Sequence, residues 1–424
     1  MLVSIDASTA KGVMKAPPSK SMGHRMLICA GLSSGKCVVN DIAPSQDMLA
    51  TIDCLRALGA KADYDGERVV IEGIGNMLSD SIKSEAECSA VDRAEVINLP
   101  CRECGSTMRF FVPIALLTGG TVSLTGSETL LKRPMTVYEE ICNNQGIDYS
   151  INAEALTVNG MLSPGEYVVR GDISSQFISG LLFALPLLKK DSVIKLLPPI
   201  ESRSYINMTI EALDIFGVKA VWTDEQGNID PNGTCIAISG NQKYAGMECT
   251  VEGDYSNAAF LDAFNLIGGD VVLTGLRADS LQGDKVYKQY YELLKGESPV
   301  LNLSDCPDLG PVCMAMAAAL NGAKFTGTRR LRIKESDRCQ AMADELVKMG
   351  IQSVIEEDTM EIIAGKLKAP AKNIDGHNDH RIVMAMSLLL TMTGGRIEGA
   401  EAVRKSLPDF YERIEKLGIR VSIN

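Results

Sequence analysis

The sequence has few aromatic residues and fewer basic than acidic side chains. Phe, Trp and Tyr make up 5% of its 424 residues, and Trp222 is the single tryptophan. The 42 basic residues are outnumbered by 54 acidic ones, which gives a formal net charge of −12. Binding to nucleic acid or to anionic membranes requires a basic surface, and single-stranded nucleic acid also requires aromatic platforms. The composition therefore argues against both classes of ligand.

Long apolar runs are also missing. No apolar stretch is of membrane-spanning length, and residues 1–18 lack the apolar core of a signal peptide. The 12 cysteines occur mostly singly within apolar stretches, where cysteine behaves as a small buried hydrophobic residue. We therefore expect a cytoplasmic protein in a reducing environment.

Two familiar cofactor signatures are absent. Residues 34–37 (SGKC) lack the upstream glycine and the final Ser or Thr of a P-loop, and no GxGxxG follows a predicted strand. A zinc site from Cys101, Cys104, His377 and His380 can be written, but the two pairs lie far apart in the sequence. We therefore expect neither a metal nor an organic cofactor.

The sequence does contain a pattern that recurs six times. A polar start leads into an apolar helix, then a turn with glycine or lysine, then a short β-branched strand. The starts lie near residues 18, 105, 172, 254, 308 and 379. Most copies continue with a second amphipathic helix that ends in glycine and with alternating strand segments. Each unit therefore predicts a helix, a strand, a second helix and a pair of strands.

The length of the chain exceeds what one hydrophobic core usually supports. Six units of helix and sheet divide naturally into two domains of three, with the helices inside and the sheets outside or the reverse. The turn-rich residues 230–245 predict a linker.

Polar and basic side chains gather at the starts of the repeated helices. In the first three copies these donors are Lys20, Ser21, Arg25, Ser106, Arg109, Ser174, Ser175 and Gln176. Helix N-termini attract anions, because their first N–H groups have no partner within the helix. Any one Ser or Asp at such a position can be an ordinary cap, but recurrence with added cations indicates a small, highly charged anionic ligand.

Seven motifs together resemble the EPSP synthases, which belong to the enolpyruvyl transferases. They are PPSKS at 17–21, GSTMR at 105–109, KRPM at 132–135, DISSQF at 172–177, KESDR at 334–338, NDHR at 378–381 and KSLPD at 405–409. They occur in family order along nearly the whole chain, which makes chance matching improbable.

The resemblance implies an α/β (α+β) fold, the two-domain inverse α/β barrel with three repeated units in each domain. It implies one domain over residues 13–237 and a discontinuous domain over 1–12 and 238–424, with the active site in the cleft between them. The implied reaction transfers the carboxyvinyl group of phosphoenolpyruvate to the 5-hydroxyl group of shikimate 3-phosphate, in the shikimate pathway of aromatic amino acid biosynthesis. A monomer without cofactors is expected.

The resemblance also implies the residues that bind each substrate. Those for phosphoenolpyruvate are Lys20, Gly105, Arg133, Gln176, Arg338, Arg381 and Lys405. Those for shikimate 3-phosphate are Lys20, Ser21, Arg25, Ser174, Ser175, Gln176, Ser202, Asp308 and Lys334. The many cations suit two substrates that each carry phosphate and carboxylate groups. Gly105 would leave room beside phosphoenolpyruvate, and sensitivity to glyphosate is a hypothesis that follows.

Three of these residues are candidates for proton transfer. Asp308 is the candidate to accept the proton of the attacking 5-hydroxyl group, and Glu335 to give and retrieve the proton on the methylene carbon. Lys20 could act as acid to the departing phosphate. Taken alone, Asp308 would be an ordinary helix cap, and only its place among the motifs favours the catalytic role.

Two alternatives remain open at this stage. The transferase that uses UDP-N-acetylglucosamine shares the fold, but it carries a cysteine on a mobile loop that Cys104 precedes here. A sliding clamp is also acidic and built of six repeats, although clamps scatter their Lys and Arg along a pore. The convergence of basic and acidic residues in motifs favours the enzyme that acts on shikimate 3-phosphate.

Overall fold

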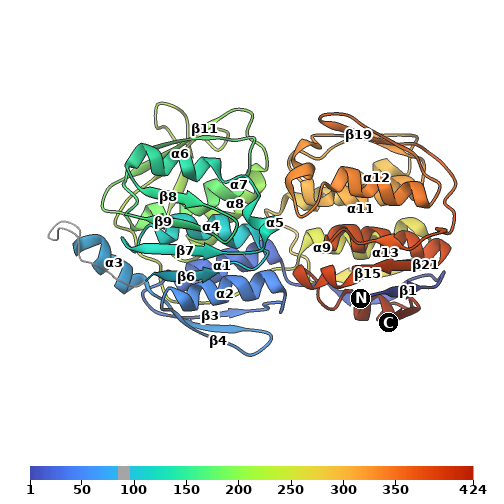
Figure 1. Cartoon of the computed structure of the whole chain (residues 1–424), viewed down its shortest axis with the longest axis horizontal. Helices are drawn as coiled ribbons and strands as arrows, with labels where there is room; N and C mark the ends of the chain where they lie inside the picture. Colours follow the sequence, from blue (N-terminus) through green and yellow to red (C-terminus); the bar gives the residue numbers. More distant parts are fainter. Residues whose placement is uncertain (85–95, 424) are drawn as a thin grey trace. The chain divides into compact units, whose positions relative to one another are not determined.

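The computed structural model describes residues 1–84 and 96–423, in two compact units (Figure 1). Unit 1 consists of Met1–Ser19 and Glu252–Asn424, and unit 2 of Lys20–Val251. The boundaries differ from those expected at 12/13 and 237/238, because residues 11–15 pair with a strand of unit 1 and residues 248–250 with a strand of unit 2. Residues 230–245 therefore lie within unit 2 and are not the linker.

Unit 2 contains three four-stranded sheets of one design, ordered β14-β3-β5-β4, β6-β7-β9-β8 and β10-β11-β13-β12. Their strands are β3 (Lys36–Asn40), β4 (Lys61–Tyr64), β5 (Val69–Glu72), β6 (Ile97–Pro100), β7 (Thr121–Thr125), β8 (Asp148–Ile151), β9 (Ala155–Asn159), β10 (Glu166–Arg170), β11 (Ser192–Leu197), β12 (Ala220–Thr223), β13 (Cys235–Ile238) and β14 (Glu248–Thr250). In each sheet the first pair is parallel and the other two pairs are antiparallel.

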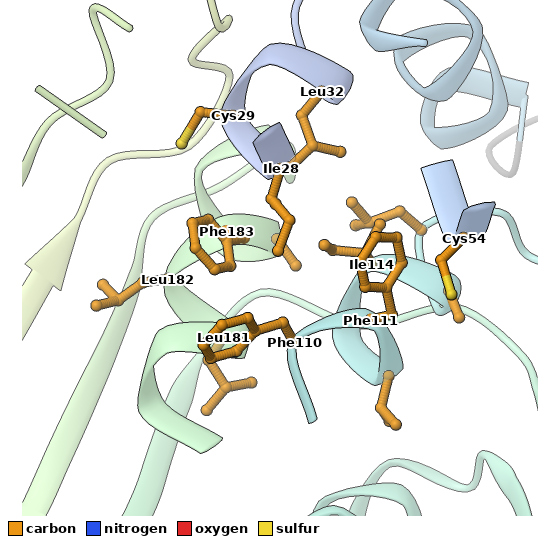
Figure 2. Close-up of a cluster of buried hydrophobic side chains, with 14 of the residues drawn as sticks. Ile28, Cys29, Leu32, Cys54, Phe110, Phe111, Ile114, Leu181, Leu182 and Phe183 are labelled. Atoms are coloured by element: carbon orange, nitrogen blue, oxygen red, sulfur yellow. The ribbon is translucent and has the colours of Figure 1, made fainter. Parts of the chain in front are cut away.

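The core of unit 2 is formed by α1 (Lys20–Gly31), α4 (Gly105–Ala115) and α7 (Ser175–Ala184). Nearly every residue of these helices is buried, and a helix that is apolar all round must lie inside its domain. Figure 2 shows Ile28, Ile114 and Phe183, one from each helix, within the same group of buried side chains. The rings of Phe110 and Phe183 lie edge to face, with their centroids 5.5 Å apart. The strands bury alternate residues, as in β10 and β11, which is typical of sheets with one outward face.

Unit 1 repeats this plan in two of its three sheets, whereas the third consists of the parallel pair β15 and β2, and one of the four-stranded sheets joins the chain ends. Its sheets are ordered β15-β2, β16-β17-β19-β18 and β20-β21-β1-β22. The strands are β1 (Val3–Ile5), β2 (Lys11–Lys15), β15 (Asp270–Thr274), β16 (Val300–Asn302), β17 (Ala323–Thr326), β18 (Ser353–Ile355), β19 (Thr359–Ile362), β20 (Ile374–Asp375), β21 (Gly395–Glu398) and β22 (Val421–Ile423). β1 pairs with both β21 and β22, so both termini lie at this sheet (Figure 1).

The core of unit 1 is formed by α9 (Tyr255–Asp262), α11 (Gly310–Ala319) and α13 (His380–Thr393). Most of their residues are buried, so the helices lie inside in both units, and the alternative with sheets inside is wrong. These three helices, like α1, α4 and α7, begin close to the predicted repeat starts.

The remaining helices pack around these cores. They are α2 (Gln46–Ala57), α3 (Gly75–Ser84), α5 (Glu128–Leu131), α6 (Thr136–Gln145), α8 (Arg203–Ile215), α10 (Tyr287–Leu294), α12 (Arg338–Lys348) and α14 (Phe410–Lys416). No helix in residues 1–84 or 96–423 has the length and apolar character needed to cross a membrane. Among the 11 cysteines in these residues no disulfide occurs and all but Cys249 are buried, whereas Cys88 lies outside the described residues.

Candidate functional site

The first group of predicted site residues lies at the N-termini of three helices of unit 1. Asp308 belongs to the short helix η4 (Pro307–Leu309), which leads directly into α11. Arg338 is the first residue of α12, and Arg381 is the second residue of α13. The repeated fold thus brings three predicted residues together from distant parts of the sequence. We call Asp308, Lys334, Glu335, Arg338, Asp379 and Arg381 the unit 1 cluster.

Asp308 is surrounded by cations. Its Oδ1 lies 3.0 Å from Nη1 of Arg338 and 3.5 Å from Nζ of Lys334. Its Oδ2 lies 3.0 Å from Nη2 of Arg381, whose Nη1 also donates to the Asp308 carbonyl oxygen. The side chain remains 18% exposed. Three cations around one carboxylate favour its ionised form, and its partial exposure leaves it open to a ligand.

Arg338 organises the buried side of the unit 1 cluster. Its Nε donates to Oδ2 of Asp379 at 2.8 Å, and its Nη2 donates to Oε2 of Glu335 at 2.7 Å. Arg338 is 1% exposed and Asp379 is not exposed at all. Burial disfavours both charges, but the neighbouring charges outweigh it, so that the pKa of Arg338 lies above and the pKa of Asp379 below the usual value. Both groups are therefore charged at neutral pH.

The guanidinium of Arg381 is fixed from a second direction. Its Nη1 donates to Oγ of Ser256 at 2.7 Å, near the start of α9. Asp284, in the short helix η3 (Gly283–Val286), lies close to this group. Burial and the charge of Asp308 raise the pKa of Asp284 to about 7. Near neutral pH this carboxyl group therefore carries a proton for part of the time.

Lys334 and Glu335 form the more accessible edge of the unit 1 cluster. Their side chains are 25% and 19% exposed. Burial lowers the pKa of Lys334 to about 8, with Asp308 partly opposing that shift. Lys405, at the end of η6 (Ala400–Lys405), donates to the carbonyl oxygen of Asn378 at 2.7 Å. This contact places Lys405 next to the motif that contains Asp379 and Arg381.

The second group of predicted residues lies at the N-termini of α1, α4 and α7 in unit 2. Lys20 begins α1, and its Nζ donates to Oδ2 of Asp47 at 2.9 Å. Their side chains are 15% and 11% exposed. Ser21, the next residue of α1, is half-buried. Asp47 thus holds the ammonium group of Lys20 at the end of the helix.

Arg25 is buried, and every nitrogen of its guanidinium donates to a protein oxygen. Its Nε donates to Oγ1 of Thr209 at 2.9 Å, and its Nη2 donates to the carbonyl oxygen of Tyr205 at 2.9 Å. Its Nη1 donates to the carbonyl oxygen of Ser21, one turn earlier in α1. Burial lowers its pKa to about 10. Arg25 therefore joins α1 to α8, and few of its five donors remain for a substrate.

Gly105 lies against the guanidinium of Arg133. A Cβ atom on Gly105 would lie 2.6 Å from Nη1 of Arg133, much closer than a van der Waals contact allows. Arg133 follows α5, which begins with the capping Ser127. The absence of a side chain at position 105 thus lets the guanidinium approach the N-terminus of α4.

Gln176 connects the starts of α4 and α7. Its Nε2 donates to Oγ of Ser106 at 2.8 Å, and its Oε1 accepts from Nη1 of Arg109 at 2.7 Å. Ser174 caps α7 by accepting from the backbone N–H of Gln176 at 3.3 Å. Ser175 is buried. The predicted donors of these two helices therefore form one hydrogen-bonded group.

Ser202 precedes α8 in an unusual conformation. It is fully buried and has φ 54° and ψ 39°, the left-handed region that residues other than glycine rarely adopt. Such conformations cluster at functional sites, where the surrounding structure holds them. The contact of Ser202 with shikimate 3-phosphate stays a prediction, because the residue is fully buried in this structure.

Several residues that hold the predicted ones were not expected at the site. They are Asp47, Ser256, Asp284 and Asp379, whereas Ser106 and Arg109 were already among the donors expected at the helix starts. Asp379 lies inside the NDHR motif and could have been found as the cap of α13, since its side chain accepts from the N–H of Arg381. Asp47 and Asp284 carry no such signal, because their partners are distant in the sequence.

Comparison with known proteins supports the interpretation of the motifs. The family model of EPSP synthase (3-phosphoshikimate 1-carboxyvinyltransferase) matches residues 6–414. The 3-phosphoshikimate 1-carboxyvinyltransferases of Clostridium kluyveri and Clostridium novyi are 37% and 38% identical, over 98% of this chain and 97% of each relative. An EPSP synthase from Acinetobacter baumannii has the same fold, with a TM-score of 0.75 at 24% identity and full coverage of both chains.

These matches settle the predicted fold and distinguish between the enzyme alternatives. The two-domain inverse α/β fold is confirmed, and the relatives bear the name of the transferase that acts on phosphoshikimate rather than that of its sister enzyme. The match spans both units, so neither unit is an added domain of another kind. The chain belongs to the EPSP synthase family.

Proposed function

We propose that this protein transfers the carboxyvinyl group of phosphoenolpyruvate to the 5-hydroxyl group of shikimate 3-phosphate. The observation that carries the proposal is the position of Asp308, a partly exposed carboxylate within 3.5 Å of Lys334, Arg338 and Arg381. An acidic base beside several cations suits the activation of an alcohol next to anionic groups.

The cations of unit 1 and those of unit 2 would each bind some of the negatively charged groups of the substrates. We propose that both units act on the same pair of substrates. Phosphoenolpyruvate would contact Lys20, Gly105, Arg133, Gln176, Arg338, Arg381 and Lys405. Shikimate 3-phosphate would contact Lys20, Ser21, Arg25, Ser174, Ser175, Gln176, Ser202, Asp308 and Lys334. The planar guanidinium groups suit phosphate and carboxylate alike, which explains the prevalence of arginine.

The reaction proceeds by addition and elimination. The 5-hydroxyl oxygen bonds to C2 of phosphoenolpyruvate while its proton passes to Asp308, and C3 gains a proton from Glu335. The resulting tetrahedral ketal then loses a proton from C3 to Glu335 as the bond from C2 to the phosphate oxygen breaks. Lys20 would protonate the departing phosphate. The products are 5-enolpyruvylshikimate 3-phosphate and inorganic phosphate.

The contacts of Asp308 explain how substrate binding would make this carboxylate a stronger base. Lys334 makes the longest of its three cation contacts, at 3.5 Å, and is the most exposed of the three cations. When Lys334 turns to the substrate phosphate, Oδ1 of Asp308 loses one stabilising charge. The carboxylate then binds a proton more readily, while Arg338 and Arg381 keep it in place.

The cellular setting forms part of the proposal. We expect a monomer in the cytoplasm that uses small-molecule substrates and needs no metal or organic cofactor. The cations and helix N-termini of the two groups of predicted residues offer the charge stabilisation that a metal gives in other phosphate-binding enzymes.

One assay tests the proposed substrate. Release of phosphate from phosphoenolpyruvate is measured with shikimate 3-phosphate and, separately, with UDP-N-acetylglucosamine. Release should occur with shikimate 3-phosphate alone. Release with only the nucleotide sugar, or with neither acceptor, would overturn the proposal.

A further inference from the structure

A buried group of three different metal-ligating side chains lies in unit 2, beside Lys20. His24 of α1, Asp47 of α2 and Cys104, the N-cap of α4, place one ligand atom each within 4.8 Å of one another. All three residues are buried. Within residues 1–84 and 96–423 no other group of His, Cys, Asp and Glu meets this distance. We call these three residues the HDC cluster.

The spacing of the HDC cluster fits a tetrahedral ion. Sγ of Cys104 lies 3.8 Å from Nε2 of His24. A metal–sulfur bond of about 2.3 Å and a metal–nitrogen bond of about 2.0–2.1 Å separate the two ligand atoms by about 3.6 Å at the tetrahedral angle. Cys104 and His24 therefore need only a small movement to bind Zn²⁺ together, and the ligand atom of Asp47 lies within 4.8 Å of both.

The orientation of His24 is fixed by a hydrogen bond of the kind that supports metal-bound histidine. Its Nδ1 lies 2.7 Å from Oγ1 of Thr51. Thr51 Oγ1 in turn contacts Oγ1 of Thr107 at 2.9 Å and lies 3.5 Å from the carbonyl oxygen of Asp47. Because the Thr51 hydroxyl can donate its own proton to either of these oxygens, it can accept a hydrogen bond from Nδ1–H of His24. Nε2 of His24 then carries the lone pair, and this atom faces Cys104.

Burial raises the pKa of the Cys104 thiol to about 12, so Cys104 keeps its proton until an ion displaces it. Its sulfur accepts from the backbone N–H of Thr107 at 3.3 Å, at the N-terminus of the 11-residue helix α4. An ion that binds there displaces the thiol proton to solvent, and the helix N-terminus stabilises the negative sulfur that remains. A thiolate, an imidazole and a carboxylate together select Zn²⁺ over Mg²⁺ or Ca²⁺.

We infer that the HDC cluster is an inhibitory site for Zn²⁺ or a similar thiophilic divalent cation. The third ligand, Asp47, is the residue that holds Lys20 at 2.9 Å. An ion on Asp47 competes with the ammonium group for the carboxylate and repels it. Lys20 is thereby displaced from the start of α1. The inhibitory effect rests on the proposed role of Lys20, whereas binding of the ion does not.

Binding is tested with the full-length protein and two serine variants. Zn²⁺ is measured by equilibrium dialysis against wild type, Cys104→Ser and Cys101→Ser. Serine at 104 keeps an oxygen to cap Thr107, and Cys101 is a buried cysteine of the same loop whose sulfur contacts the carbonyl oxygen of Leu99 instead. Wild type and Cys101→Ser should bind one ion per chain, with at least tenfold weaker binding in Cys104→Ser. Equal binding by all three proteins would overturn the site.

An absorption spectrum of the wild type tests the site even if Cys104→Ser does not fold. Co²⁺ added to the wild type should produce the near-ultraviolet absorption of a cobalt–thiolate bond, and Zn²⁺ should abolish it. Bound Co²⁺ without this absorption would overturn the site. Thr51→Val, which removes the hydrogen bond to His24, should weaken binding by about 10–100-fold.

Enzyme activity measured with added Zn²⁺ then tests whether binding of the ion inhibits the protein. Zn²⁺ should inhibit wild type and Cys101→Ser at the concentrations at which it binds, and Cys104→Ser should keep its basal activity and resist inhibition. Stoichiometric binding to an active wild type without inhibition would overturn the regulatory effect and argue against the role of Lys20. Inhibition of Cys104→Ser at the same concentrations as the wild type would show that the ion acts elsewhere.

Discussion

Arg338 and Asp379, 41 residues apart in the sequence, form a fully buried ion pair with Nε and Oδ2 separated by 2.8 Å. The pair joins the starts of α12 and α13 and orients the guanidinium toward Asp308 and Glu335. The unit 1 cluster therefore depends on a residue that touches no substrate in the proposed mechanism. Asp379 is a positioning residue.

Asp379→Asn should destabilise the protein and reduce turnover. The substitution leaves the buried charge of Arg338 with one charged partner fewer. Breaking a buried ion pair in this way lowers the free energy of unfolding by about 3–5 kcal/mol. The free energy of unfolding is measured by urea denaturation, together with kcat. Glu72→Gln is the control, because the pair of Lys61 and Glu72 is exposed and should not affect stability measurably. Equal effects of the two substitutions would contradict the structural role of Asp379.

Asp308→Asn should bind substrates but turn them over slowly. The amide retains the shape of the side chain, yet it cannot accept the hydroxyl proton, and loss of a general base lowers kcat by about 10²–10⁴-fold. Calorimetry should show shikimate 3-phosphate bound at least as tightly, since one negative charge near the ligand is gone. Turnover within a few-fold of wild type would contradict the role of Asp308 as the base.

The affinity for shikimate 3-phosphate should fall as the pH rises above about 8, the pKa of Lys334. Lysine is charged below its pKa, so Lys334 is already charged at pH 7. At pH 9 it must first take up a proton from solvent before it can bind the ligand as a cation. The loss approaches about tenfold per pH unit for one proton. Lys334→Arg should keep its charge and remove this decline. A decline of the same size in Lys334→Arg would assign it to another group.

Gly105→Ala should weaken the binding of phosphoenolpyruvate without destabilising the fold. The new methyl group would lie 2.6 Å from Nη1 of Arg133, which is the end of a flexible side chain and can move. A displacement of a substrate-positioning group by about 1 Å can lower the catalytic efficiency by up to about 100-fold. We therefore expect the KM for phosphoenolpyruvate to rise by about 10–100-fold. The urea denaturation curve should stay unchanged. An unaltered KM would show that Arg133 does not hold this substrate.

His377 should stabilise the protein more in acid than in alkali. Its Nε2 lies 3.0 Å from Oε1 of buried Glu345, and this hydrogen bond raises the pKa of His377 above its usual value of 6.5. The contribution is therefore fully present below pH 6.5 and is lost as the pH rises through the raised pKa. The difference in unfolding free energy between wild type and His377→Asn should be larger at pH 5.5 than at pH 8.5. A difference independent of pH would exclude a charged His377.

Features that depend on neighbours along the chain could be predicted from the sequence. The starts of α1, α4, α7, α9, α11 and α13 were found because helix caps and apolar runs are local signals. The composition argued against binding to nucleic acid or anionic membranes, and the order of the motifs indicated the family. Gly105 and Arg133 could be chosen from motifs, although their contact could not.

The tertiary structure alone decided which side chains meet. Arg381 reaches Asp308 across 73 residues, and Lys20 reaches Asp47 across 27, and no local pattern encodes either separation. Burial also gave Arg25 a structural role that its motif did not indicate. The physical reason is that pKa values and ion pairs depend on distance and solvent exposure in space, and only the packing of six helices in two cores sets both.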